Sequence, residues 1–260
     1  MKSDSQRSFQ EARHPEREKG RDLFLSGFFI EELRSLVPNP ERILVLGSGD
    51  GKESRVLIEH FPEAAVLSMD LSAPEIESSS SVEHLLGTLV RGDWDCPPFA
   101  AATFDLAVFF AALHHSACLE KTLRSVSSIL RPGGALYATH EPMASLLLGR
   151  SQKARMANIA EEEGGIETSP SLGEYQEALE KAGFTSFRVG ASSLNLIRLE
   201  ANEPSFADVR LRRSAWPERF SATCLKAITR FDKNAKLSFL FLLQRLAFGL
   251  FGVTITGKKE

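Results

Sequence analysis

The chain of 260 residues has few cysteines and no large excess of charge of either sign. Its three cysteines, Cys96, Cys118 and Cys224, are far apart and form neither a paired metal-binding motif nor a disulfide framework. We therefore expect no metal site and a reducing, cytoplasmic compartment. The formal net charge of −3 disfavours broad binding to nucleic acids.

Long uninterrupted apolar runs are also absent. None reaches the roughly 18 to 20 residues that a bilayer-spanning helix needs. Residues 1–22 are polar and mixed in charge, which matches neither a signal peptide nor a transit peptide. With 43% hydrophobic and 25% charged residues, the composition is that of an ordinary globular protein with a sizeable core.

The most informative feature that is present is an apolar run that ends in three glycines. Residues 43–51 read ILVLGSGDG, which places the glycines at alternate positions 47, 49 and 51. Such a run, followed by apolar residues at helical spacing, is typical of a buried strand, a tight turn and a helix. Because the start of a helix offers free N–H groups and a partial positive charge, the turn is suited to a nucleotide-like or carboxylate-bearing molecule.

Strand-like and helix-like patterns alternate along most of the chain. The expected strands are residues 43–46, 65–69, 85–90, 104–109, 134–139, 185–190 and 252–256, and the helices between them include 53–60, 118–130 and 172–182. This alternation predicts an α/β fold, with a doubly wound, mostly parallel seven-stranded sheet and helices on both faces. Ligands of such sheets bind outside the carboxyl ends of the strands.

The chain is expected to have three parts. These are a helical cap at residues 1–38, a binding core at 39–203, and at 204–260 a basic and apolar helical insertion that precedes the last strand. From Ser205 to Glu260, eleven Lys and Arg face four Asp and Glu. The insertion is either a contact with a membrane surface or lipid, or a lid with a solvated basic face. In both cases we expect it to select the substrate, together with the cap.

Four polar or glycine-rich features fall at the ends of four successive expected strands. The glycine turn is the first, and Asp70 follows the next strand, where a carboxylate can accept hydrogen bonds from ribose hydroxyls. Asp93 and Trp94 follow the third strand, where they can bind an exocyclic amine and cover a base. The fourth feature is FDLAVFFAALHH at residues 104–115, with LRPGG at 130–134.

These motifs, in this order, resemble those of the class I S-adenosylmethionine-dependent methyltransferases over roughly residues 40–189. The resemblance implies an enzyme of Rossmann-like fold whose cofactor is S-adenosylmethionine. It also implies cofactor contacts for Gly47, Ser48 and Gly49 at the methionine end, Asp70 at the ribose, Leu71, Asp93 and Trp94 at the adenine, and Phe110 near the methionine amine. The family usually has an acid where this chain has Val45, and Asp50 is a candidate substitute.

A nicotinamide dinucleotide site is the main alternative for the glycine turn. It would need a third glycine at position 52, where the chain has Lys52. We expect methyl transfer to O, N or C of a small or lipid-like acceptor. Nucleic acids are disfavoured, because no Asn/Asp-Pro-Pro-aromatic box follows the fourth strand and Cys96 precedes its prolines instead of following one.

His114 and His115 are the candidate catalytic residues. Imidazole titrates near neutrality, so either could orient the substrate or remove a proton from the attacking atom. Either could equally pack or cap the next helix, since methyl transfer depends chiefly on alignment. His140 with Glu141 is a second possible acid/base pair, and Tyr175 is either a pocket residue or an exposed residue at a helix start.

Two other functions stay open. One is a catalytically silent member that binds the cofactor without chemistry. The other is a membrane-associated biosynthetic partner that docks through residues 205–253, which would place the protein at the inner face of a membrane.

Overall fold

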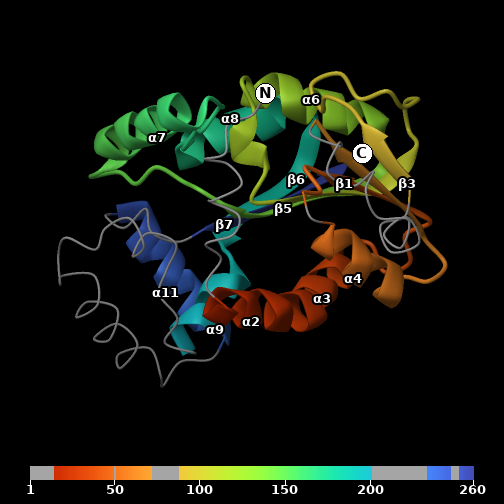
Figure 1. Ribbon diagram of the computed structural model, residues 1–260, viewed down its shortest axis with the longest axis horizontal. Helices are drawn as coiled ribbons and strands as arrows, with labels where there is room; N and C mark the ends of the chain where they lie inside the picture. The colour runs from red at the N-terminus through yellow and green to blue at the C-terminus, as the bar shows by residue number, and fades with distance from the viewer. Residues whose placement is uncertain (1–14, 50, 72–87, 201–232, 247–251) are drawn as a thin grey trace.

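The computed structural model describes residues 15–49, 51–71, 88–200, 233–246 and 252–260. Its centre is a seven-stranded sheet in the order β3-β2-β1-β4-β5-β7-β6 (Figure 1). The strands are β1 Arg42–Leu46, β2 Ala65–Asp70, β3 Thr88–Arg91, β4 Phe104–Phe110, β5 Leu130–Glu141, β6 Phe184–Ala191 and β7 Val253–Lys259. Strands β1 to β5 pair in parallel, whereas β7 runs antiparallel between β5 and β6. The predicted α/β fold with a mostly parallel sheet is confirmed.

Helices cover both faces of this sheet (Figure 1). Helices α6 (Leu119–Ile129), α7 (Gly149–Glu163) and α8 (Leu172–Lys181) lie on one side. The other side carries α2 (Pro15–Phe24), the π-helix η1 (Leu25–Phe29), α3 (Ile30–Leu36), α4 (Lys52–His60) and α9 (Ser193–Glu200). Helix α11 (Lys233–Leu246) packs beside α9 and β6, and a short 3-10 helix, η3 (Leu113–His115), follows β4.

Strand β1 shows why a continuous apolar run forms the middle of this sheet. Side chains alternate along a strand, so Ile43 and Val45 join the apolar cluster under α2 and η1, while Leu44 and Leu46 join the cluster under α6 and α8. All four are at most 1% exposed. Burial on both faces requires apolar residues at every position, as is typical of parallel sheets.

Most described strand boundaries lie within a residue of the expected ones, but β5 and β7 differ by more. Strand β5 begins at Leu130 instead of position 134, because Phe104 of β4 pairs with Leu130 before the register shifts. Gly134 is needed there, since a Cβ would lie 2.9 Å from the carbonyl oxygen of Arg131. Strand β7 ends at Lys259 and so extends past the expected residue 256.

The expected helical cap and the segments α11 and β7 all pack with the central sheet. Phe24, Phe29 and Leu33 of the expected cap are fully buried in the cluster that also holds Ile43 and Val45. Strand β7 lies inside the sheet, and Leu240 of α11 is buried against Leu196. The basic positions 210–230 lie outside the described residues. Within the described ranges, every helix is too short or too polar to cross a bilayer.

Candidate active site

The glycine turn joins β1 to α4 in a conformation that only glycine adopts readily. Gly47, Gly49 and Gly51 have φ values of +71°, +49° and +72°. A Cβ on Gly47 would also lie 2.6 Å from the Cβ of Ala112, so the turn touches the segment that follows β4. The turn therefore sits where the carboxyl ends of β1 and β4 meet.

Asp70 lies against this turn. At the end of β2, its Oδ2 accepts a hydrogen bond of 3.0 Å from the backbone N–H of Gly49. The backbone N–H of Gly47 donates to Met69 at 2.8 Å, which holds the turn over β2. The structure thus brings the first two predicted features together.

Ser48 carries a polar atom that suits a ligand in this turn. Its side chain is 2% exposed, and its Oγ has no hydrogen-bond partner among the described residues. A buried hydroxyl without a partner is unfavourable, so a ligand that bonds it would be stabilising. Together with the glycines, this arrangement fits the polar methionine end of S-adenosylmethionine.

Trp94, Asp93 and Leu71, which were also predicted to contact the cofactor, differ from one another in exposure and in their contacts. Trp94 is 7% exposed, packs edge-on against Phe109 with ring centroids 6.0 Å apart, and approaches Gly47. Asp93 accepts a hydrogen bond from the backbone N–H of Asp95 at 2.9 Å and so orders its own loop. Leu71 is 52% exposed directly after Asp70.

Phe110 faces the N-terminal helices. Its ring lies 6.1 Å from that of Phe24, and the guanidinium of Arg21 lies 5.0 Å above it. The ring of His140 stacks on it at 6.0 Å. The side chain of Phe110 is therefore part of an aromatic contact between β4 and α2.

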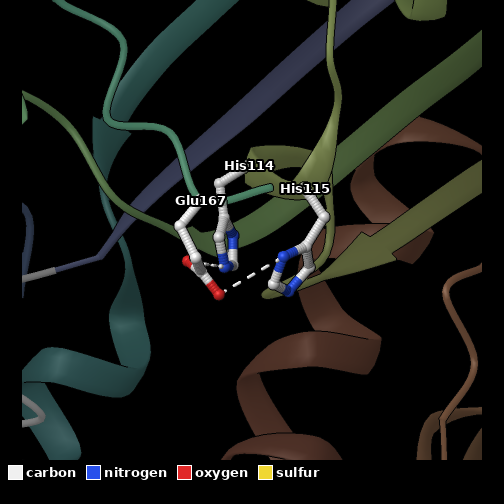
Figure 2. A group of neighbouring side chains, drawn as sticks. All are labelled: His114, His115 and Glu167. Carbon is white, nitrogen blue, oxygen red and sulfur yellow. Dashed lines mark ion pairs between the residues drawn. The ribbon is translucent and has the colours of Figure 1, made fainter. Parts of the chain in front are cut away.

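The two candidate catalytic histidines lie on η3, close to two carboxylates. Glu141, which is fully buried at the end of β5, accepts hydrogen bonds from the backbone N–H groups of Ala112, Leu113 and His114. It also bonds Nδ1 of His114 at 2.8 Å. On the other side, Glu167 lies 3.5 Å from Nε2 of His114 and 3.4 Å from Nδ1 of His115 (Figure 2).

The charge state of His114 reflects these neighbours. Burial lowers its pKa, but the hydrogen bond that it donates to Glu141 and the charges of Glu141 and Glu167 raise it more. The pKa of His114 therefore lies above its ordinary value of 6.5.

The sequence matches known proteins over the part that builds this site. Residues 44–138 match the family described as "Methyltransferase domain". Malonyl-[acyl-carrier protein] O-methyltransferase of Legionella pneumophila is 32% identical over 112 residues, covering 42% of this chain and 39% of that protein. The enzyme of the same name from Methylococcus capsulatus is 29% identical over 167 residues, covering 62% of this chain and 58% of the relative. Residues 44–138 therefore form a methyltransferase domain.

Solved structures agree with this methyltransferase fold. The YcgJ protein from Bacillus subtilis superposes with a TM-score of 0.58 at 16% identity, over 91% of this chain and 98% of that one. Phosphoethanolamine N-methyltransferase 2 of Haemonchus contortus, in complex with S-adenosylmethionine, superposes with a TM-score of 0.57 at 19% identity. The match covers 87% of this chain and 51% of that one. For the methyltransferase domain, the predicted family, enzyme class and cofactor are confirmed, whereas the individual residue contacts stay predictions.

The structure differs from expectation for Tyr175 and for the possible acid/base pair of His140 and Glu141. Tyr175 is neither a pocket residue nor exposed, because it is fully buried and its hydroxyl donates to the carbonyl oxygen of Pro142 at 2.9 Å. His140 and Glu141 do not form an acid/base pair with each other. The imidazole of His140 stacks on Phe110, while Glu141 turns to His114.

An ion pair near the turn of the methyltransferase domain was not predicted. Glu53, in the first turn of α4 and 3% exposed, accepts from Nε of Arg21 at 3.0 Å and from its Nη2 at 2.5 Å. The two residues lie 32 positions apart, so no local pattern joins them. Val45 packs in the core, and Asp50 lies outside the described residues.

Proposed function

We propose that this protein transfers the methyl group of S-adenosylmethionine to O, N or C of a small or lipid-like acceptor. The observation that carries the proposal is the turn at Gly47 and Gly49, which lies against Asp70 and holds the Ser48 hydroxyl, for which the described part of the chain offers no hydrogen-bond partner. When bound there, the cofactor supplies an electrophilic methyl group. The protein would then have to hold the acceptor's nucleophilic atom in line with it.

The acceptor side is best assigned to the region around η3. Ala112 touches the glycine turn, and His114 and His115 follow directly after it. Beyond them, a groove of about 440 Å³ runs past Ser116, Glu167 and Ser169. That volume is within the range of small-molecule sites. We therefore propose that His114 and His115 act on the acceptor.

A carboxylate oxygen on a carrier-bound acyl group is the first acceptor to test. Both relatives described above are malonyl-[acyl-carrier protein] O-methyltransferases by name. A relative with a different name, demethylmenaquinone methyltransferase of Thermus thermophilus, is 30% identical over 106 residues. It suggests a carbon atom on a lipid-like ring as the next acceptor to test. The chain matches less than two thirds of the length of each of these relatives.

Calorimetry with S-adenosylmethionine tests the cofactor site. We expect Asp70→Ala to weaken binding at least about tenfold, because a charge-assisted hydrogen bond contributes roughly 1.5 to 3 kcal/mol. Glu63→Ala, which removes an exposed acid after α4, is the matched control and should leave the affinity unchanged. Wild-type affinity in a folded Asp70→Ala variant would remove this residue from the site.

Transfer from labelled cofactor tests the reaction itself. Malonyl-loaded carrier protein, a quinone precursor and metabolite extracts are offered in turn, and the labelled product is identified. Binding of the cofactor without transfer to any acceptor would favour the catalytically silent alternative.

A further inference from the structure

Three side chains that commonly bind metals converge beside η3. His114 and His115 come from η3, and Glu167 comes from the connection between α7 and α8 (Figure 2). Each offers a ligand atom, and these atoms all lie within 4.8 Å of one another. The two imidazole rings lie next to each other, with centroids 4.1 Å apart, and the carboxylate of Glu167 lies to one side of them (Figure 2).

Backbone contacts hold Glu167 opposite the histidines. The N–H and the Oγ1 of Thr168 both donate to the carbonyl oxygen of His114, at 3.0 and 2.8 Å. On the other side of Glu167, the carbonyl oxygen of Ile166 lies 2.8 Å from Nδ1 of His115. Because both neighbours of Glu167 are fixed to η3, the three side chains are brought together before any ligand binds.

Glu141 orients His114 in the way that metal-bound histidines require. Its buried carboxylate bonds Nδ1 of His114 at 2.8 Å and is itself fixed by three backbone N–H groups. With the proton on Nδ1, the lone pair of Nε2 points toward Glu167. A carboxylate behind the imidazole is the usual second partner of a metal-ligating histidine, and it makes the other nitrogen more basic.

The charge at this cluster also favours a cation. The side chain of Glu167 is only 13% exposed, and among the described residues its ion-pair partners are His114 and His115, with no lysine or arginine. Buried Glu141 adds a second negative charge. A bound cation would offset these two carboxylates.

The distances suit a small metal ion. Two donor atoms that each lie about 2.1 Å from a tetrahedral metal are about 3.4 Å apart. One carboxylate oxygen of Glu167 lies 3.5 Å from Nε2 of His114, close to that spacing. His115 would bind the metal through Nε2, because its Nδ1 donates to the carbonyl oxygen of Ile166. Two nitrogens and one oxygen are a ligand set of zinc and of similar transition metals, whereas magnesium and calcium prefer oxygen ligands.

We propose that His114, His115 and Glu167 bind one divalent transition metal of the zinc class. Three protein ligands leave coordination positions open, as in catalytic sites, and Glu167 also lines the groove assigned to the acceptor. The open positions would bind an oxygen of the acceptor. This last role rests on the proposed methyl transfer, whereas metal binding does not.

Cobalt(II) titration of the chelator-treated full-length protein tests the site, because bound cobalt has a visible absorption band. We expect one cobalt per chain, displaced by zinc. Glu167→Gln and His115→Ala should each weaken cobalt binding at least about 100-fold. Glu177→Gln changes another acid of the same groove and is the matched control, which should bind cobalt like the wild type.

The outcomes separate metal binding from methyl transfer. Absence of a stoichiometric cobalt complex in the wild type, or wild-type affinity in both folded variants, would overturn the proposed metal site. Circular dichroism reports whether each variant is folded. If one of the two variants is unfolded, cobalt binding by the other variant decides whether the site exists. Calorimetry with S-adenosylmethionine is run on the same samples, so failure of the cofactor site is seen independently of the metal.

Discussion

Gly47 has less room for a side chain than Gly49 in the glycine turn. A Cβ there would meet the Cβ of Ala112 at 2.6 Å and the ring of Trp94 at 3.3 Å, and its φ of +71° disfavours any other residue. Gly49 has a positive φ but nothing within 4 Å of an added Cβ. The two glycines are therefore needed for different reasons: close approach and conformation at Gly47, conformation alone at Gly49.

We expect Gly47→Ala to lower the free energy of unfolding by about 1 to 3 kcal/mol, from the strained backbone and the crowding against Ala112. Urea unfolding measures the change. Gly173→Ala is the control, since this residue lies in helix α8 with open space around an added Cβ, and alanine there should be neutral or stabilising by up to about 1 kcal/mol. Equal stability of the Gly47→Ala variant and the wild type would contradict the crowding.

At the residue scale, local patterns predicted that the glycine turn and Asp70 lie together, but they gave only two members of the histidine cluster. Gly49 and Asp70 were predicted from glycine spacing and strand ends, and the structure joins them by a hydrogen bond. The sequence predicted no metal site, because Glu167 is remote from both histidines along the chain. The bonds of Thr168 to the carbonyl oxygen of His114, across 54 positions, and the bond between His115 and Ile166 bring it to η3.

Helix α8 shows how a short element is fixed at its start. Ser171 caps the helix: its side chain accepts from the backbone N–H of Glu174, and the Glu174 carboxylate accepts from the backbone N–H of Ser171. Lys153 of α7 donates to both oxygens of that carboxylate at 2.7 Å. The capping pair thus also joins α8 to α7, at the edge of the groove assigned to the acceptor.

This arrangement predicts a pH-dependent contribution of Glu174 to stability. Burial raises the pKa of Glu174, but Lys153 and the hydrogen bonds from Ser171 lower it more, so it lies below its ordinary value of 4.5. A carboxyl whose pKa is depressed on folding stabilises the protein above the unfolded-state pKa, and the contribution is lost as the pH falls through the folded-state pKa. We therefore expect Glu174→Gln to destabilise the protein at pH 7 and to have less effect below about pH 4.

Urea unfolding at both pH values measures the effect of Glu174→Gln. Glu180→Gln, an exposed acid on the same helix, is the control and should change little at either pH. A destabilisation by Glu174→Gln that does not diminish in acid would show that the carboxylate charge does not contribute.

At the scale of elements, helix and strand positions followed largely from the sequence. The run at 104–110 forms a strand because its residues face apolar clusters on both sides. The start of β5 was missed, because it depends on pairing with Phe104 and a register shift instead of on apolar periodicity. Tyr175 was misjudged for a related reason, since its burial depends on the loop at Pro142.

For the whole molecule, the C-terminal strand is part of the sheet and not an appendage. Strand β7 pairs with β5 from Ala135 to Glu141 and with β6 along its full length. Lys259 donates to the carbonyl oxygens of Ser127 and Leu130 at 2.7 and 2.8 Å. Strand β7 therefore joins β6 to the rest of the described sheet.

A chain that ends after Pro204 should consequently fail to fold cooperatively, because β6 would lose its only neighbour in the described sheet. Thermal unfolding followed by circular dichroism measures this. Docking of the insertion to a membrane is better tested by a triple variant that leaves β7 in place. This variant combines Arg210→Glu, Arg212→Glu and Arg213→Glu. The three positions lie outside the described residues.

If the insertion docks to anionic lipid, that triple variant should bind phosphatidylserine vesicles more weakly than the wild type, by about 1 kcal/mol for each charge removed. Equal binding of both proteins, or no binding of either, would favour a lid over membrane docking. The division of the chain at residues 38 and 203, and the cytoplasmic location, stay predictions.

The sequence by itself determined the α/β class, the glycine turn and the order of the cofactor motifs. Each of these depends on residues a few positions apart, whose spacing alone sets a strand, a turn or a helix start. The tertiary structure decided which distant groups share a site: Arg21 with Glu53, His114 with Glu141, and both histidines with Glu167. These contacts join segments 27 or more residues apart, and side chains so far apart meet only when the sheet and its loops are packed.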